Sequence, residues 1–519
     1  MQTRRDQVQA HRFVVSRLTS GLLRNDPDVP EGPNTRTNRA LAFGGALGAV
    51  IAAGFLVFGF VSPGGSAAWK QPGTLIVEQG TGNRYLYDGT LRPVRNYASA
   101  RLIAGAGMAV HTVPRATLAQ VRRGGPVGIT GAPDALPSAA RFDTGAWQVC
   151  AATRTTDSGG TAPATTLAVG GARSGDGVGP GQALLVDGPD GTSYLLWRGN
   201  RFRMSSGTST ADALGYGTAR ALPVSAAFLD AVPAGPDLAP RDVPGKGTPG
   251  PVLDGLATRV GQVFVVRTPG AAQQYYLLER AGLVPVTTTQ AALELAAPDE
   301  RSAAYAGSAP TAVPLATDAL NSALVRGGTA ATGDGSQALP PTPPALVPVD
   351  AGQAACVRLD PAAPADGDGT GTGARISLSV APAAGLGAGS AGAGADTSAA
   401  QAHAAPACLP VDAVLLPPGG GALVRALGAG GGPVGATTYL VADDGVKYLV
   451  PDAQAAEALG YDRAAARGVP APLLAMLPTG PDLSPRDALA GRAETTGGST
   501  CTDGNGGTGT VGSGAAGDS

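Results

Sequence analysis

The hydrophobic pattern of the chain changes abruptly once, at residues 41–61. This stretch, LAFGGALGAVIAAGFLVFGFV, holds 21 consecutive residues without a charge. As a helix rising 1.5 Å per residue it would be about 31 Å long, which matches the hydrocarbon core of a bilayer. A cleaved signal peptide is the main alternative, but the stretch starts late in the chain and lacks a convincing small-residue cleavage motif. The pattern therefore predicts one transmembrane helix at 41–61.

The segment before this helix is basic and has helical spacing. Residues 1–39 carry seven arginines and four acidic residues, whereas only Lys70 lies close beyond the other end of the apolar stretch. The positive-inside rule therefore predicts a single-pass protein of the cell (inner) membrane with its N-terminus in the cytoplasm. In the leader, residues 1–40, apolar positions such as Val8, Leu18 and Leu22 give a basic amphipathic helix. It could lie on the inner leaflet, dock on a partner's cytosolic domain, or remain solvated and only set the topology.

Beyond the membrane segment the chain contains a duplication. Residues 214–242 align without gaps to residues 459–487, with sixteen of the 29 positions identical and a constant offset of 245. Duplications of this kind are typical of stacked or pseudo-symmetric architectures.

Alternating hydrophobic positions ahead of each copy predict β-hairpins, at 183–197 and at 439–450. In the second hairpin, Asp444-Gly445 favours a type I′ turn. Short helices should follow, such as Ala453–Leu459 ended by Gly460, and Ala226–Ala231 closed by Pro233. Two weaker relatives of the hairpin occur at 74–94 and 261–286. The pattern therefore predicts four hairpin–helix–helix units, at about 74–139, 183–245, 261–328 and 437–490.

Two regions connect these units and carry strand-like pieces, namely Trp147–Ala151, Val357–Leu359 and Arg375–Val380. We expect them to combine into a central β domain from about 140–182 and 346–436, with the units around it in pseudo-two-fold symmetry. The predicted fold class is α+β: one transmembrane helix plus an elongated extracytoplasmic domain at 70–490. Segments biased toward Gly, Ala, Ser and Thr are expected to be mobile loops or, at the end, a disordered tail; they are 158–181, 327–345, 361–407 and 491–519.

Composition changes this picture only at the cysteines. Aromatic residues make up 4% of the chain, so the cores must be built from Val, Leu and Ala, and the net charge of −2 without a dense basic run argues against nucleic-acid binding. None of Cys150, Cys356, Cys408 and Cys501 forms a C-x-x-C pair, which argues against metal or redox motifs and favours disulfides in an exported domain. Three connectivities are possible by arithmetic. Cys150 and Cys356 fall one in each connecting region, so a bridge between them would staple the centre, and a second bridge could join Cys408 and Cys501.

No catalytic motif stands out. The only lysines are Lys70, Lys246 and Lys447, and none completes a P-loop. The run DGDGTGTG at 366–373 follows no clear strand and opens no helix, which favours filler over a phosphate or calcium loop. The three histidines, His11, His111 and His403, form no zinc or hydrolase motif. We therefore predict no catalytic, cofactor or metal site, with extracytoplasmic ATP hydrolysis and cell-wall binding as the alternatives to a scaffold.

Together these features resemble the EccB family, membrane core components of actinobacterial type VII (ESX) protein secretion systems. The opening TRRDQVQAHRFVVSRLTSGLLRNDPD at 3–28 is similar to the family's N-terminal signature, and PAGPDLAPRD and PTGPDLSPRD are similar to the endings of its exported repeats. The resemblance covers residues 1–490. It implies a structural subunit that scaffolds and stabilises the secretion channel on its extracytoplasmic side. The partners it implies are further copies of the chain, the FtsK-like ATPase EccC, the polytopic EccD, EccE, and the mycosin protease.

The resemblance also bears on the cysteines and on catalysis. It implies that Cys150 and Cys356 form the family's disulfide. Family members have been labelled ATPases, and the lack of a P-loop puts that label in doubt for this chain. The chain departs from the family pattern in the insertion at 361–407 and in the extra pair Cys408 and Cys501.

Overall fold

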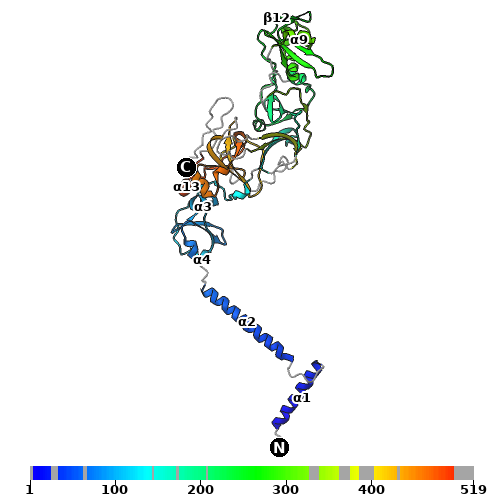
Figure 1. Ribbon diagram of the computed structural model, residues 1–519. Coiled ribbons are helices and arrows are strands. Elements are labelled where there is room, and N and C mark those ends of the chain that lie inside the picture. The colour runs from blue at the N-terminus through cyan, green and yellow to red at the C-terminus, as the bar shows by residue number, and fades with distance from the viewer. Residues whose placement is uncertain are drawn as a thin grey trace. The chain divides into compact units, whose positions relative to one another are not determined.

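The computed structural model describes residues 4–24, 33–61, 67–142, 145–170, 175–205, 208–325, 338–361, 375–384, 403–428 and 433–495. The chain forms two compact parts, Met1–Gln71 and Pro72–Ser519, each described by itself below (Figure 1).

The first part consists of helices. They are α1 (Arg4–Arg24), α2 (Pro33–Val61) and the short 3₁₀ helix η1 (Ala67–Lys70). Within α2, Thr37–Leu56 is the one segment of the described helices that is long and apolar enough to cross a membrane, with a mean hydropathy of 1.7. Helix α2 itself begins at Pro33, before the predicted start at residue 41. Helix α1 exposes the apolar side chains of Val8, Leu18 and Leu22, as its spacing predicts.

The second part contains four sheets that share one strand order. In each, three consecutive strands pair antiparallel, and a fourth strand pairs parallel with the first. Sheet 1 comprises β1 (Thr74–Gln79), β2 (Arg84–Tyr87), β3 (Leu91–Pro93) and β4 (Val110–Pro114). Sheet 2 comprises β8 (Gln182–Asp187), β9 (Ser193–Trp197), β10 (Asn200–Arg203) and β11 (Leu222–Pro223). Sheet 3 comprises β14 (Val263–Val266), β15 (Gln274–Glu279), β16 (Gly282–Val286) and β17 (Val313–Pro314). Sheet 4 comprises β22 (Gly421–Leu427), β23 (Pro433–Ala442), β24 (Lys447–Val450) and β25 (Arg467–Pro470).

In chain order, each sheet has a helix at the same two positions relative to its strands. Between the third and fourth strands lie α3 (Tyr97–Ala104), α5 (Thr208–Ala213), α7 (Thr288–Leu295) and α11 (Ala453–Leu459). After the fourth strand lie α4 (Arg115–Leu118), α6 (Ala226–Asp230), α9 (Thr317–Ala323) and α12 (Ala471–Ala475). The remaining helices are α8 (Glu300–Ala303), α13 (Pro485–Ala490), η2 (Ala139–Arg141) and η4 (Arg463–Ala465).

After the second helix, the chain returns along the edge of the third strand. Isolated parallel bridges mark this return in all four sheets: Leu91 with Arg123, Arg201 with Ala234, Leu283 with Leu324, and Lys447 with Thr479. The third strand is thereby paired on both sides.

Local sequence explains where several helices begin and end. The Asp452 carboxylate accepts a hydrogen bond from the Ala455 amide at the start of α11, and Gly460 ends that helix in the left-handed conformation with φ of 86°. Thr287 and Gln290 form a reciprocal capping box at the start of α7. The predicted helix Ala453–Leu459 with its Gly460 end is therefore confirmed.

A six-stranded central sheet completes the second part. Its order is β21-β6-β5-β19-β20-β7, in which β6 to β20 run antiparallel. The strands are β5 (Trp147–Thr155), β6 (Thr161–Val169), β7 (Asp176–Gly177), β19 (Gln353–Asp360), β20 (Arg375–Pro382) and β21 (Ala413–Leu415). The three strand-like pieces noted in the sequence are parts of β5, β19 and β20. The mixed α+β class is thus confirmed.

Two further strand pairs complete the described topology. Strands β12 (Pro249–Leu253) and β13 (Leu256–Arg259) form a separate hairpin. Strand β18 (Ala345–Leu346) adds to sheet 2 by pairing parallel with β8.

Three sequence expectations differ from the structure. Strands β6 and β20 lie within the stretches 158–181 and 361–407, which are expected to be mobile loops, yet Leu167 and Leu378 are buried in the central core. Strand β22 falls in the range expected for the central domain, but it is the first strand of sheet 4. Strand β6 pairs with the preceding β5 and the distant β21, and β22 pairs with β23 and β25; this pairing on both sides outweighs a local composition rich in Ala, Gly and Thr.

The third difference concerns a turn. Gly445 has a φ of 75°, but Asp444 does not have a positive φ, and the Gly445 amide donates to the carbonyl of Ala442. The connection is therefore not the predicted type I′ turn, which needs two consecutive positive φ values. Asp254 and Gly255, with φ of 52° and 75°, do have that geometry between β12 and β13. The Asp-Gly signal at 254–255 could have predicted this hairpin.

Candidate functional site: the central sheet and the helices packed on it

A disulfide joins the two inner strands of the central sheet. Cys150 of β5 and Cys356 of β19 are direct cross-strand partners, with their Cα atoms 4.1 Å apart and an S–S distance of 2.08 Å. Both residues are buried, in a cluster of small side chains that includes Ala152, Ala354 and Ala381. The bridge connects positions separated by 206 residues, so it ties together the two halves of the second part.

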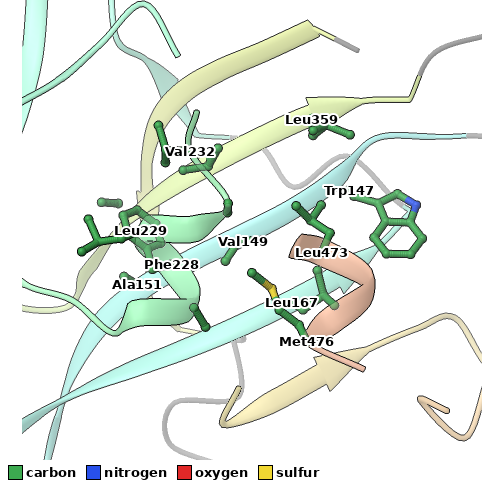
Figure 2. Packing of buried hydrophobic residues seen from close by; sticks show 14 of the residues in the cluster. Trp147, Val149, Ala151, Leu167, Phe228, Leu229, Val232, Leu359, Leu473 and Met476 are labelled. Atoms are coloured by element: carbon green, nitrogen blue, oxygen red, sulfur yellow. The ribbon is translucent and has the colours of Figure 1, made fainter. Parts of the chain in front are cut away.

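The opposite face of the same strands carries large apolar side chains. Alternation along β5 points Trp147, Val149 and Ala151 away from the disulfide, and Leu167 of β6 and Leu359 of β19 join them. Figure 2 shows these side chains beneath two short helices, α6 and α12. The central sheet therefore has a disulfide face and a helix face.

The two helices on this face occupy equivalent positions in the two copies of the sequence duplication. At the offset of 245, Leu229 of α6 corresponds to Leu474 of α12, and Phe228 to Leu473. All four side chains are buried in the same core cluster. Each duplicated segment thus places its second helix on the central sheet.

A cation, half-buried Arg201 or buried Lys447, supports the end of each helix. The Arg201 guanidinium on β10 donates to the carbonyl of Leu229 and pairs with Asp230 at 2.9 Å. The Lys447 ammonium on β24 donates to the carbonyl of Leu474 at 2.5 Å and to that of Leu477 at 3.2 Å. Cations at helix C-termini satisfy free carbonyls and complement the helix dipole. Burial lowers the pKa of Lys447 to about 8.

The shared Gly-Pro-Asp-Leu motif also has a packing role. A Cβ at Gly235 would lie 2.6 Å from the ring of Phe202, and one at Gly480 would lie 2.2 Å from the ring of Tyr448. The leucines at the end of the motif are fully buried, and the amide of Leu483 donates to the carbonyl of Leu449 in the third strand of its sheet. The motif therefore lets the backbone return close to the third strand.

Neighbouring sheets share cores through their helices. Helix α3 of sheet 1 packs with α11 and α13, which follow strands of sheet 4, in a cluster that includes Leu102, Leu459 and Ala488. Helix α7 of sheet 3 packs with α5 of sheet 2 and places Leu293 in the core around Trp197.

The remaining predicted site residues lie apart from this arrangement. Cys408 is within the described part of the chain, but Cys501 and the run 366–373 lie outside it, so their predicted roles stay predictions. Of the three lysines, Lys447 donates a hydrogen bond to a carbonyl of α12, and Lys246 pairs with Glu300 at 3.0 Å. Lys70 is the last residue of η1. Among the described residues, no three or more His, Cys, Asp or Glu side chains are grouped so that they could hold a metal ion.

Sequence reasoning missed the helix face and its cations. The duplication signal was available, because Leu229 and Leu474 align, but the alignment alone does not show that both helices pack on one sheet. Arg201 and Lys447 differ in residue type and are offset by 246 rather than 245, so their common role is visible only in three dimensions.

The chain matches a family model described as the type VII secretion system ESX-1 transport TM domain B, over residues 1–496. A curated relative, the "ESX-3 secretion system ATPase EccB3" of Mycolicibacterium smegmatis, is 31% identical over 299 residues, which cover 56% of this chain and 56% of the relative. The chain thus spans little more than half the length of the curated relatives it matches.

Two solved structures are similar to most of this chain. The EccB3 dimer from the ESX-3 core complex has a TM-score of 0.59 at 26% identity, covering 80% of this chain and 99% of that one. A chain of the intact ESX-5 inner membrane complex has a TM-score of 0.59 at 24% identity, covering 94% and 95%. The second likeness concerns the fold alone.

Proposed function

This chain belongs to the EccB family of type VII secretion components, and from this premise we propose that it is a structural subunit of an ESX-type secretion complex in the cell membrane. The observation that carries the proposal is the family match over residues 1–496, which includes the apolar helix and all five large sheets. In the described part of the chain, the side chains of Arg201 and Lys447 support the ends of the helices on the central sheet. This is the chemistry of a scaffold.

The orientation in the membrane is part of the proposal. The arginines ahead of α2 favour a cytoplasmic N-terminus, so residues after Val61 would be extracytoplasmic. A disulfide between Cys150 and Cys356 agrees with an oxidising compartment.

We further propose that the four similar sheets are repeat units around the central sheet, in pseudo-two-fold symmetry. Sheets 2 and 4 are equivalent because each lays its second helix on the central sheet. Sheets 1 and 3 are equivalent because each packs its first helix, α3 or α7, against one of that pair. We propose the same range for the extracytoplasmic domain as the sequence predicts, 70–490. Its fourth repeat unit, predicted from the sequence at about 437–490, is proposed to begin at β22 instead.

The proposed partners are other membrane components of the secretion system. These are an EccC-like FtsK-type ATPase, EccD-like and EccE-like proteins, a mycosin protease and further copies of this chain. Self-association is supported by the similar solved structure, which is an EccB3 dimer.

Catalysis is not part of the proposed role, although similar proteins carry the word ATPase in their names. Nucleotide binding by a P-loop needs a lysine in a glycine-rich loop that opens a helix. Lys447 is buried on a strand, and Lys246 is paired with Glu300. The alternative would gain support if the purified full-length protein hydrolysed ATP with saturable kinetics that a point variant abolished. Retention of the protein on purified peptidoglycan would likewise support a cell-wall-binding role.

Deletion of the gene tests the scaffold role directly. The proposal expects the large detergent-extracted complex of the remaining components to disappear from native gels, and to return when the full-length chain is supplied. An unchanged complex in the deletion strain would refute it.

A further inference from the structure

Sheets 2 and 3 meet at a buried cluster of charged side chains. Glu294 lies in the last turn of α7 and is 1% exposed, and Glu300 opens α8 and is fully buried. The segment that leaves sheet 2 contributes Arg241 and Lys246, and Glu279 of β15 and Asp299 stand at the rim. Arg241, Lys246 and Asp299 interact with the two buried glutamates, and Glu279 pairs with Arg241.

The contacts in this cluster cross the junction. Glu294 Oε1 accepts a hydrogen bond from the Arg241 amide at 2.5 Å. Lys246 Nζ lies 3.0 Å from Glu300 Oε2 and 3.6 Å from Asp299 Oδ2, and Arg241 Nη2 lies 3.5 Å from Glu279 Oε1. Glu294 Oε2 and Arg241 Nη1 are buried without a hydrogen-bond partner in the described part of the chain. Buried ionised groups that are only partly paired are costly.

The equivalent junction between sheets 1 and 4 is built differently. Counting from the helix caps Asn96 and Thr287, the position of Glu294 corresponds to Ile103 of α3, which packs in an apolar cluster. On the other side, Ser484 caps α13 by accepting a hydrogen bond from the Asp487 amide.

Sequence differences between the two copies of the duplication account for the different construction of the two junctions. At the offset of 245, Ala239 replaces Ser484 and Pro244 replaces Leu489. The alanine side chain at residue 239 cannot cap a helix, and Pro244 disfavours helical conformation at residue 243. The Arg241 amide, one residue before the position whose equivalent is capped by Ser484 in the other copy, donates instead to the Glu294 carboxyl group. The charged cluster is therefore specific to the junction of sheets 2 and 3.

We propose that Glu294, with Arg241, Lys246 and Glu300, forms a proton-controlled joint between sheets 2 and 3. With the carboxyl group of Glu294 protonated, the junction is held closed. With the group ionised, the junction opens more readily. This inference is independent of the proposed function, because it concerns the coupling of two sheets within one chain.

The direction of the effect follows from the electrostatics. Burial raises the pKa of Glu294 from 4.5 to about 7, against the lowering effects of the Arg241 amide and of Lys246. Burial also raises the pKa of Glu300. The closed junction therefore retains a proton that the open form releases, so its stability falls as the pH rises from 4.5 to about 7.

Hydrogen exchange of the full-length protein in detergent tests the joint. We compare the protection factors of the amides of residues 239–248 and 288–304 after correction for intrinsic exchange rates. We expect these factors to be lower at about pH 8 than at about pH 5.5, by about tenfold or more. Glu294→Gln mimics the protonated carboxyl group and can still accept the Arg241 hydrogen bond. It should lose less protection than the wild type between these pH values, because residue 294 no longer ionises whereas Glu300 still can.

Two controls make the result specific. Glu457→Gln makes the same change at an exposed position of α11 and should leave the pH dependence of the wild type intact. The amides of Gly128 and Ala488, at the junction of sheets 1 and 4 where Ile103 takes the place of Glu294, should show no comparable loss in the wild-type protein. The inference is overturned if wild-type protection at the joint is the same at both pH values, or if Glu294→Gln responds to pH as the wild type does. The wild-type comparison stands even if that variant folds poorly.

Discussion

At the scale of single residues, the identical Gly-Pro-Asp-Leu motifs illustrate what sequence can and cannot give. Their identity indicates a common role, but glycine alone suggests a turn. In the structure, Gly235 and Gly480 instead make room for the rings of Phe202 and Tyr448, which come from elsewhere in the chain. Which side chain faces a glycine is a property of the fold, so it could not be predicted from the motif.

Gly480→Ala should destabilise sheet 4. The new methyl group would lie 2.2 Å from the Tyr448 ring, and that ring is held by a hydrogen bond from its hydroxyl group to Asp444 at 2.6 Å. Overpacking of this kind costs about 1–3 kcal/mol. Thermal unfolding measures the change. Gly107→Ala is the matched control, because no atom lies within 4 Å of its added Cβ; equal effects of the two substitutions would contradict this account.

The double variant Cys150→Ala/Cys356→Ala should lower the stability of the second part by about 2–5 kcal/mol, since the bridge closes a long loop. Calorimetry under oxidising conditions should show a lower unfolding temperature than the wild type has. The central sheet would need another source of stability if the two proteins unfolded at the same temperature.

At the scale of elements, local patterns predicted well what local physics determines. The helix at 453–459 has an Asp cap at one end and a Gly end at the other, and strands β5, β19 and β20 carry β-branched and apolar residues. Two of the fourth strands, β11 and β17, were missed because they are only two residues long and carry no periodicity. They are defined by parallel pairing with the first strand of their sheet, which is a non-local contact.

Leu473→Ala should test the packing of α12 on the central sheet. The side chain is 1% exposed in the main core, so its truncation should cost about 2–5 kcal/mol. Leu489→Ala, on a side chain that is 49% exposed, should change stability by less than about 0.5 kcal/mol. Chemical unfolding monitored by tryptophan fluorescence can compare the two, with Trp147 in the affected core. A similar cost at both positions would argue against the docking of α12.

At the scale of the whole molecule, the sequence predicted one apolar helix followed by a large α+β part, and both are present. It did not reveal how the sheets combine, because the shared cores of sheets 1 and 4 and of sheets 2 and 3 join residues far apart in sequence, such as Leu102 with Leu459 and Ala183 with Leu293. The proposed topology can be tested on its own.

Protease added to intact spheroplasts should digest the chain after residue 61 and spare the leader and α2. The basic leader ahead of an uncharged helix predicts this orientation. Mass spectrometry of the protected fragments identifies the side that was cut, and lysed spheroplasts provide the control. Protection of residues 72–495 with loss of the leader would reverse the topology.

The most direct test of the structural-subunit role is affinity purification of the full-length protein from mild-detergent membranes, followed by native sizing and mass spectrometry. The account predicts co-migration in a large complex with an FtsK-like ATPase, a polytopic membrane partner and further copies of the chain. Recovery of an isolated monomer or dimer, from cells shown to express those partners, would contradict it.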